Sequence, residues 1–274
     1  MMLDLNKFGK VNTKLNNIFV NANPYPHIII DDFLKFEDAE ELLKEHSNET
    51  SEKYWGSYVH FNEKKSGMTK IDQMGPHTKK VIKKLSDKKF ISWLEKLTGI
   101  NDLIPDQELD GGGLHLIENG GFLNVHVDFL AHTTNRNWSR QINLLLYLNK
   151  EWDESWNGAL ELWDKNMQEC VKKIQPVFNR CVIFNTCEGS YHGHPEPLKT
   201  PPEIKRRSLA LYYFRDEGKP VPLKPTNYRS RPNETIINKT LISLDRKLLW
   251  IYAFSKRYLG LKDNIIQKIL KKIF

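Results

Sequence analysis

Near the middle of the chain the sequence reads Ile142-Asn143-Leu144-Leu145-Leu146-Tyr147-Leu148. This run is too continuously apolar for a strand with one face in water, so we expect a central, buried strand. Further short apolar runs alternate with turn residues on both sides of it, at 114–117, 122–127, 141–149, 159–163, 170–178, 181–186 and 207–214. Many short strands at close spacing predict an all-β sandwich or jelly roll.

Helices are expected before this β-rich region. Residues 26–34 read as a strand that ends in a turn, and 36–46 read as an amphipathic helix with acidic residues in its first turn. More helix is expected over 76–98, with Gly99 as its stop. Residues 1–23 read as a polar lead-in.

The C-terminal part of the chain is expected to be a separate segment. Four prolines at its start predict an extended linker, and 236–259 and 261–274 then read as amphipathic helices. We therefore expect a first domain at 1–218, with its β core at about 111–216, followed by a linker and a basic helical tail at 219–274.

The positive charge of the chain lies in this tail. The 274 residues carry a net charge of +7, but residues 219–274 hold 13 Lys and Arg against 3 Asp and Glu, so the remainder is slightly acidic. Nucleic-acid binding by the body of the chain is therefore not expected. We interpret the tail as helices docked on the body, with peripheral contact to a membrane or a partner protein as the alternative.

Composition excludes several classes of protein. Apolar residues make up 39% of the chain, near the globular norm, which excludes a disordered chain. No apolar run reaches the roughly 18 residues of a membrane-spanning helix, and the first residues lack the apolar core of a signal peptide. Three cysteines are too few for a disulfide framework, so we expect a reducing, cytoplasmic location.

A metal site is indicated by His126-Val127-Asp128. Side chains alternate along a strand, so His126 and Asp128 share one face, and an imidazole beside a carboxylate suits a divalent ion. A pair of histidines, His192 and His194, follows after a gap long enough for several strands to return to the first one. Two histidines and one carboxylate form the facial triad of non-haem Fe(II) oxygenases. Alternation allows either histidine of the pair as the third ligand.

A basic pair, Arg206 and Arg207, opens the last strand of the β core. A guanidinium inside a pocket binds a carboxylate through two parallel hydrogen bonds. If Arg206 points inward, the same strand lines the pocket with Ser208, Ala210 and Tyr212. The opposite phase would place leucines around a charged ligand, so strand phase favours Arg206 over Arg207.

Taken together, these motifs resemble the Fe(II)- and 2-oxoglutarate-dependent dioxygenases, and within them the prolyl 4-hydroxylase-like group. The resemblance covers about 111–216 in order and includes His-x-Asp, the His-Gly pair at 192–193, Arg-x-Ser at 206–208, and the stretches 147–152, 158–163 and 176–180. It implies an α+β protein built on a double-stranded β-helix (a cupin-like jelly roll), with packed N-terminal helices and a C-terminal helical extension.

The resemblance also implies the roles of individual residues. His126, Asp128 and His192 would bind Fe(II) and form the catalytic centre, because the family pattern matches the first histidine of the His-x-His pair. Arg206 would pair with the far carboxylate of 2-oxoglutarate, and Tyr147 would hydrogen-bond the same cosubstrate.

Two departures from the family pattern concern the cosubstrate pocket. The family often has another tyrosine a few residues before His-x-Asp, at a position where this chain has Leu116. In addition, 14 residues separate His192 from Arg206, which is longer than usual, and the extra length is the Pro-rich loop 195–202. The pocket wall is therefore expected to differ from that of the family.

The activity implied by the resemblance is hydroxylation of an unactivated C–H bond by O2, coupled to decarboxylation of 2-oxoglutarate to succinate, with L-ascorbate keeping the iron reduced. The expected substrate is a protein side chain, a small molecule or a glycan. Two alternatives stay open. One is a non-catalytic β-helix binding module, and the other is a jelly-roll enzyme that uses its metal for other chemistry.

Overall fold

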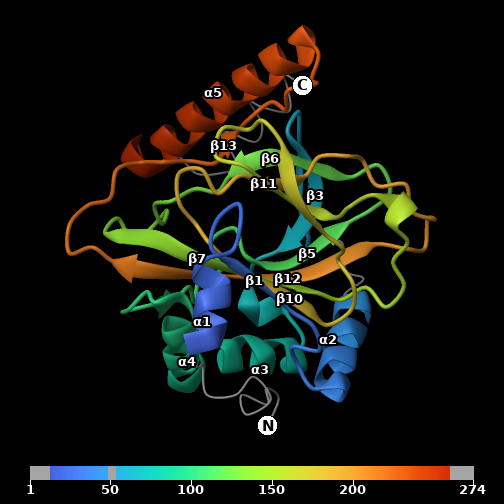
Figure 1. Ribbon diagram of the computed structural model, residues 1–274, viewed down its shortest axis with the longest axis vertical. Helices are drawn as coiled ribbons and strands as arrows, with labels where there is room; N and C mark the ends of the chain where they lie inside the picture. Colours follow the sequence, from blue (N-terminus) through green and yellow to red (C-terminus); the bar gives the residue numbers. More distant parts are fainter. Residues whose placement is uncertain (1–12, 49–53, 260–274) are drawn as a thin grey trace.

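The computed structural model describes residues 13–48 and 54–259, which are arranged as shown in Figure 1. The strands are β1 (His27–Ile30), β2 (Gly56–His60), β3 (Glu63–Met68), β4 (Ile104–Pro105), β5 (Gly113–Ile117), β6 (Phe122–Val127), β7 (Trp138–Tyr147), β8 (Leu160–Trp163), β9 (Cys170–Ile174), β10 (Arg180–Asn185), β11 (His192–His194), β12 (Arg206–Asp216) and β13 (Asn227–Tyr228). The helices are α1 (Thr13–Val20), α2 (Phe36–Asn48), α3 (Pro76–Leu85), α4 (Lys88–Thr98) and α5 (Ile236–Leu259), with 3-10 turns at Ile71–Gln73 and Glu154–Trp156.

The strands form one strongly curled antiparallel sheet, the double-stranded β-helix that the family resemblance implied. Its order is β1-β10-β7-β12-β5-β3-β6-β11-β8-β9, and β13, β2 and β4 pair with β6, β3 and β12 respectively. Because the sheet curls on itself, β6 and β11 lie opposite β7, β10 and β12 (Figure 1). The two halves of the sheet therefore face each other.

Strand β7 is central, as its continuous apolar run predicts. It pairs with β10 along one edge and with β12 along the other. Ile142, Leu144 and Leu146 are completely buried, and they pack in the main hydrophobic core. The other strands predicted from Gly111 onward are also present, with ends that differ by a few residues.

Alternation along β12 separates the barrel interior from the helical layer. Leu209, Leu211 and Tyr213 pack in the core shared with the helices. Arg206 points to the other side, where its guanidinium contacts Tyr147. The strand phase inferred from the sequence is therefore the one that the fold adopts.

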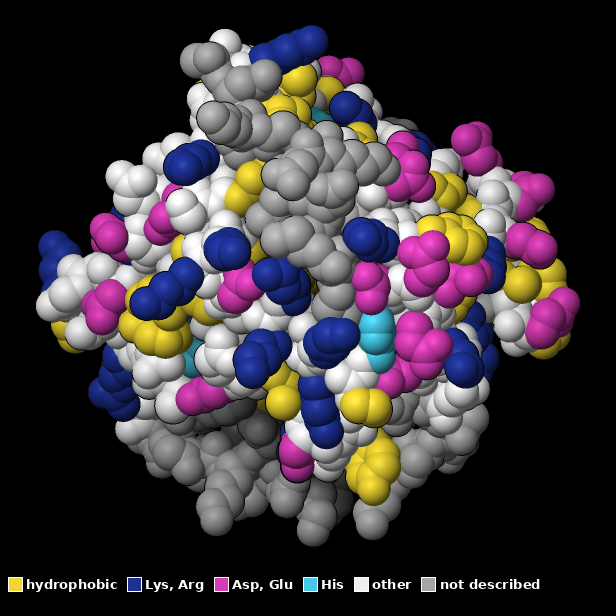
Figure 2. Space-filling view, turned by 90° about the horizontal axis from the view of Figure 1, so that it is seen from below, with side chains coloured by type: hydrophobic (Ala, Val, Ile, Leu, Met, Phe, Trp, Pro, Cys, Tyr) yellow, Lys and Arg dark blue, Asp and Glu magenta, His cyan; other side chains and the backbone are white. Residues whose placement is uncertain are grey.

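Helices α1 to α4 cover one side of the sheet (Figure 1). The helix expected over 76–98 is divided in two, since Asp87 caps α4 by accepting a hydrogen bond from the amide of Phe90 at 2.8 Å. Gly99 ends α4 with a φ of 74°, a left-handed conformation that glycine adopts without strain. Figure 2 shows this helical side from below, where Lys and Arg side chains lie among Asp and Glu side chains.

The sequence analysis missed α1, the β2–β3 hairpin and the two-residue strands β4 and β13. The polar lead-in contains α1, which is fixed on α4 by a hydrogen bond of 3.0 Å from Asn16 Nδ2 to the carbonyl of Leu97. The β2–β3 hairpin lies in a stretch whose charged residues show no alternation, and β3 becomes a strand because it pairs with both β5 and β6. Long-range pairing here overrides local propensity.

The tail helix α5 is docked on the body, as the first interpretation of the tail proposed. Asp245 is buried and accepts hydrogen bonds from His60 Nδ1 at 2.8 Å and Asn62 Nδ2 at 2.5 Å. His60 Nε2 also lies 2.9 Å from a carboxylate oxygen of Glu63. Farther along α5, Arg257 donates to the carbonyl of Val221 at 2.7 Å. These contacts join the helix to the β2–β3 hairpin and to the linker.

The described residues cover only part of the predicted tail. The second predicted tail helix, 261–274, falls outside the described residues. Within residues 13–48 and 54–259, no helix has both the length and the apolar character needed to cross a membrane. The division of the chain at residue 218 stays a prediction.

The docking of α5 is expected to depend on pH. Burial alone would lower the pKa of His60, but its hydrogen bonds to Asp245 and Glu63 outweigh burial and raise that pKa from 6.5 to about 9. A raised folded-state pKa stabilises the fold fully below pH 6.5, and this stabilisation disappears as the pH rises through 9. Thermal unfolding followed by circular dichroism should therefore show a falling midpoint over this interval.

The His60→Gln variant should show a flatter profile over the same interval. The matched control is His77→Gln at the start of α3, which should keep the profile of the unmodified protein. A His60→Gln profile that matches the unmodified one would contradict a role of this imidazolium in holding α5.

Candidate metal centre and cosubstrate pocket

The structure brings His126, Asp128 and His192 together. β11 pairs with β6 so that His192 lies directly opposite His126, and their ring centroids are 4.5 Å apart. The Nε2 atoms of His126 and His192 lie 3.4 and 3.2 Å from the two carboxylate oxygens of Asp128. One potential ligand atom from each residue lies within 4.8 Å of the others, so the group can hold a metal ion.

Both imidazoles are oriented by main-chain carbonyl groups. His126 Nδ1 lies 2.8 Å from the carbonyl oxygen of Asn124, and His192 Nδ1 lies 3.0 Å from that of Ser190. A carbonyl oxygen only accepts, so each Nδ1 carries a proton, and Nε2 is the nitrogen of each ring that faces the cluster. Burial lowers the pKa of His126 and so favours its neutral, ligating form. This is the usual way in which a protein prepares a histidine to bind a metal.

Asp128 is held by Arg140 and Asn143 from β7. Arg140 Nη2 and Asn143 Nδ2 donate to one carboxylate oxygen of Asp128 at 3.1 and 2.6 Å, and Arg140 Nε donates to Asn143 Oδ1 at 2.7 Å. The guanidinium of Arg140 lies 3.3 Å from the ring centroid of Tyr212. Although burial opposes it, the charge of Arg140 holds the pKa of Asp128 well below its usual range. The carboxylate therefore stays ionised.

Of the two side chains that hold Asp128, the sequence pointed to a buried role for Asn143 but not for Arg140. A polar residue in an apolar strand requires a buried partner, and Asp128 is that partner. Strict alternation would put Arg140 on the opposite face from Asn143. The register of β7 against β12 shifts between Ile142 and Arg140, so that both side chains point to Asp128. No signal in the sequence marks this irregularity.

The second predicted group, Arg206 with Tyr147, lies deeper in the barrel. Arg206 is 5% exposed and donates from Nε to the carbonyl of Gly158 at 2.8 Å and from Nη2 to the hydroxyl of Tyr147 at 3.4 Å. Burial raises the pKa of Tyr147, so the phenol keeps its proton. Gly158 is required here because it has a φ of 77° and because a Cβ would lie 2.6 Å from Leu198 Cδ2 and 2.9 Å from Trp152 Cζ2.

Arg206 has no acidic partner among the residues that the structure describes. A buried cation without a compensating charge is costly, and such a site is prepared to bind an anion. Arg207, the alternative in the sequence analysis, lies on the opposite face of β12 and donates to the carbonyl of Lys205 at 3.4 Å.

His194 lies between the two groups. It is 3% exposed, and neither ring nitrogen has a hydrogen-bond partner. Burial and the nearby charges of Arg206 and Lys65 lower its pKa well below the usual value, so the ring is neutral. His192, rather than His194, has its Nε2 in the cluster with His126 and Asp128. His194 therefore presents unpaired polar atoms to the space next to the guanidinium.

The pocket wall formed by β5 differs from the sequence expectation. The sequence analysis placed Leu116 at the position where the family often has a tyrosine. His115 pairs with Ser208 across β5 and β12 and shares the inner face with Arg206, whereas Leu116 pairs with Arg207 on the other face. Side chains of directly paired residues lie on the same face of a sheet, so His115 occupies the pocket wall. Burial lowers its pKa from 6.5 to about 3, and this ring is also neutral.

Residues 112–214 match the sequence profile of the 2OG-Fe(II) oxygenase superfamily. The matched residues extend from β5 into β12 and so include the metal cluster and Arg206. A mouse protein named prolyl 3-hydroxylase OGFOD1 is 27% identical over 208 residues, which make up 72% of this chain and 34% of that protein. The chain thus spans about a third of the length of this relative.

Solved structures show the same fold. The prolyl-4-hydroxylase of Pseudomonas putida superimposes with a TM-score of 0.52 and 17% identity, covering 73% of this chain and 98% of that chain. A Trichoplax adhaerens prolyl hydroxylase in complex with a hypoxia inducible factor peptide fragment gives a TM-score of 0.56 and 20% identity, covering 78% and 94%. The family resemblance and the fold that it implied are thereby confirmed.

The residues present fit the two groups that a 2OG-Fe(II) oxygenase uses. Two imidazoles whose Nε2 atoms face one ionised carboxylate make a donor set suited to Fe(II). A buried guanidinium whose partners are all neutral, and a histidine whose ring nitrogens accept and donate no hydrogen bond, suit a dicarboxylate.

Divalent metal binding is expected to depend on Asn143. The Asn143→Ala variant removes the shorter of the two hydrogen bonds to Asp128, so the carboxylate loses its fixed orientation. Loss of such a supporting contact typically weakens metal binding by about 10- to 100-fold. Competition with a chromophoric chelator measures the affinity, and Asn238→Ala, on exposed α5, is the control. An unchanged affinity in Asn143→Ala would show that Arg140 alone positions Asp128.

Proposed function

We propose that this chain is an Fe(II)- and 2-oxoglutarate-dependent dioxygenase that hydroxylates an unactivated C–H bond. His126, Asp128 and His192 are the proposed iron ligands and the catalytic centre, and Arg206 with Tyr147 is the proposed binding site for 2-oxoglutarate. The observation that carries this proposal is the position of a buried guanidinium with only neutral partners in the same barrel as a two-histidine, one-carboxylate cluster. A metal enzyme of other chemistry has no use for Arg206.

Iron and 2-oxoglutarate, when bound, supply the activation of O2, coupled to decarboxylation of the cosubstrate to succinate and CO2. The protein's own residues bind and orient the cosubstrate. Arg206 would pair with the far carboxylate of 2-oxoglutarate, and the hydroxyl of Tyr147, which keeps its proton, would donate to the same group. Three protein ligands leave coordination positions free for the cosubstrate and O2.

The surroundings of the centre limit access of water. The ring of Phe184 lies 4.7 Å from that of His192, and Tyr228 lies 5.3 Å from His126. These aromatic walls bury the histidines and leave Asp128 as the partly accessible ligand, with 14% of its side chain exposed. Exclusion of water strengthens the electrostatic contacts inside the site and protects it from side reactions. Substrate therefore approaches from the Asp128 side.

The substrate proposed is a protein side chain. The support comes from the relatives, since the mouse protein is named a prolyl 3-hydroxylase and the Trichoplax enzyme is in complex with a peptide fragment. We also propose a requirement for ascorbate and a cytoplasmic location. The latter is supported by three free cysteines, of which Cys187 is exposed.

The decisive experiment measures succinate with Fe(II), 2-oxoglutarate and O2. The unmodified protein is expected to form succinate slowly without substrate, and a screen for a mass increase of one oxygen then identifies the substrate. His126→Ala and Asp128→Ala should abolish succinate formation while circular dichroism shows that the fold is retained. Turnover that persists in either variant would show that the ligand assignment is wrong. Absence of turnover in the unmodified, iron-loaded protein would favour a non-catalytic binding module.

The cosubstrate assignment is tested by a matched pair of variants. Arg206→Gln should raise the KM for 2-oxoglutarate by about 10- to 100-fold, since hydrogen bonds to charged groups contribute roughly 1.5–3 kcal/mol. Arg207→Gln removes the neighbouring charge on the other face of β12 and should leave the KM unchanged. If Arg207→Gln instead raised the KM, the strand phase argument would fail.

A further inference from the structure

A cleft opens beside the proposed iron ligand Asp128. Its volume is about 420 Å³, within the usual range of ligand sites. One wall comes from the body of the barrel, at Val127, Leu130 and the loop 188–191. The opposite wall comes from the C-terminal segment, namely Lys224, Pro225, Thr226, Asn227, Arg229, Arg246, Lys247 and Trp250. The tail therefore forms half of the entrance to the site.

The wall from the C-terminal segment is cationic. Of its four basic residues, Lys224 pairs with Glu188 at 2.6 Å. Arg229 donates to the hydroxyl of Tyr191 at 3.3 Å, and Arg246 donates to Asn227 Oδ1 at 3.3 Å, both of which are neutral groups. Across residues 13–48 and 54–259, no carboxylate forms an ion pair with Arg229, Arg246 or the exposed Lys247. Three positive charges thus face the cleft uncompensated.

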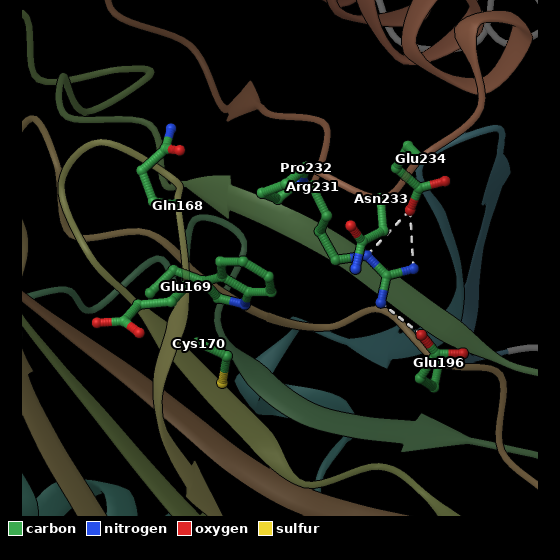
Figure 3. A pocket seen from close by; sticks show the side chains of 9 residues that line it. Gln168, Glu169, Cys170, Glu196, Arg231, Pro232, Asn233 and Glu234 are labelled. Atoms are coloured by element: carbon green, nitrogen blue, oxygen red, sulfur yellow. Dashed lines mark hydrogen bonds and ion pairs between the residues drawn. The ribbon is translucent and has the colours of Figure 1, made fainter.

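In a second pocket, by contrast, the cation is neutralised by carboxylates. The pocket has a volume of about 470 Å³. Its lining comes from three segments of the chain, represented by Trp163, Glu196 and Arg231 (Figure 3). Figure 3 shows Arg231 between two carboxylates, with Glu234 at 2.8 Å and Glu196 on the other side. This pocket contains none of the proposed iron ligands. Its charges fix the start of the tail to the loop after β11 and leave no cation for a ligand.

The cationic wall is held in a fixed position relative to the metal cluster. β13 pairs with β6, which places Asn227 opposite Val127 and Tyr228 opposite His126. Asp245, the residue before Arg246, is buried against His60 and Asn62. The body of the protein therefore holds the cations in the wall of the cleft that Asp128 also lines.

We propose that the substrate is an acidic peptide, whose carboxylate side chains next to the target residue bind Arg229, Arg246 and Lys247 while the target side chain enters beside Asp128. The inference rests on the proposed function. The cations come from an extended linker and a helix and lie along the cleft wall, an arrangement that suits several acidic groups along one chain. Trp250, 48% exposed in the same wall, offers an aromatic surface for an apolar neighbour of the target residue.

The probes are three short fluorescein-labelled peptides with a central proline and glutamate, glutamine or lysine on both sides. Anisotropy is measured with the full chain loaded with Fe(II) and 2-oxoglutarate under argon. The glutamate peptide should bind at least about tenfold more tightly than the glutamine peptide, since two or more charge pairs form. The preference should fall as NaCl rises from about 50 to about 500 mM, because salt screens exposed charges.

Two variants on α5 and a matched control locate the effect. Arg246→Gln and Lys247→Gln should each weaken binding of the glutamate peptide by about fivefold and leave the glutamine peptide unaffected. Lys239→Gln removes a positive charge from the same helix outside the cleft and should retain the preference. Equal binding of the glutamate and glutamine peptides, or equal loss in Lys239→Gln, would overturn the inference.

The proposed function and the cleft inference fail in different ways. Succinate formation by the unmodified protein together with no preference for the glutamate peptide would overturn only the acidic substrate. A preference lost in Arg246→Gln, in a protein that forms no succinate, would support the acidic peptide site and overturn the oxygenase. Tighter binding of the lysine peptide would overturn the assignment of the cationic wall.

Discussion

The pairing of β11 with β6 is the contact on which the rest of the site depends. It places His192 opposite His126, and the alternation of side chains along β6 then adds Asp128 to the same face. A register shift of one residue would turn these side chains to the other face of the sheet and separate the three ligand atoms. Four strands, β7 to β10, lie between β6 and β11 in the chain and form much of the barrel wall. The sheet must curl on itself to bring β6 and β11 side by side.

Two buried arginines of the barrel differ in whether a carboxylate neutralises their charge. Arg140 is neutralised by Asp128, and the aromatic ring of Tyr212 covers its guanidinium. Arg206 has only neutral partners, the carbonyl of Gly158 and the hydroxyl of Tyr147. The first arrangement fixes a carboxylate in one orientation, and the second leaves an uncompensated charge that a dicarboxylate can stabilise. In the proposed function, the first arginine supports the metal site and the second binds the acidic cosubstrate.

The C-terminal segment is part of the site rather than an appendage. Its linker adds β13 to the edge of β6, and α5 is held through the buried Asp245. The excess positive charge of the sequence is therefore not spread over the surface, since part of it faces the cleft beside Asp128. The shape and charge of this entrance are set by a segment outside the β core, which is where enzymes with a shared fold can differ in substrate.

By itself the sequence determined the β architecture, the strand phase of β12 and the common face of His126 and Asp128, because short apolar runs and alternation are local signals. Alternation allowed either His192 or His194 as the third member of the cluster, and only the family resemblance favoured His192. The sequence also indicated that Asn143 needs a buried partner. Only the tertiary structure decided that Arg140 holds Asp128, since this depends on a register irregularity between distant strands. The β2–β3 hairpin, His115 in the pocket wall and the cationic cleft were likewise decided by pairing across the sheet. Local patterns specify which face a side chain occupies, whereas its partner across the barrel is fixed only when remote segments pack together.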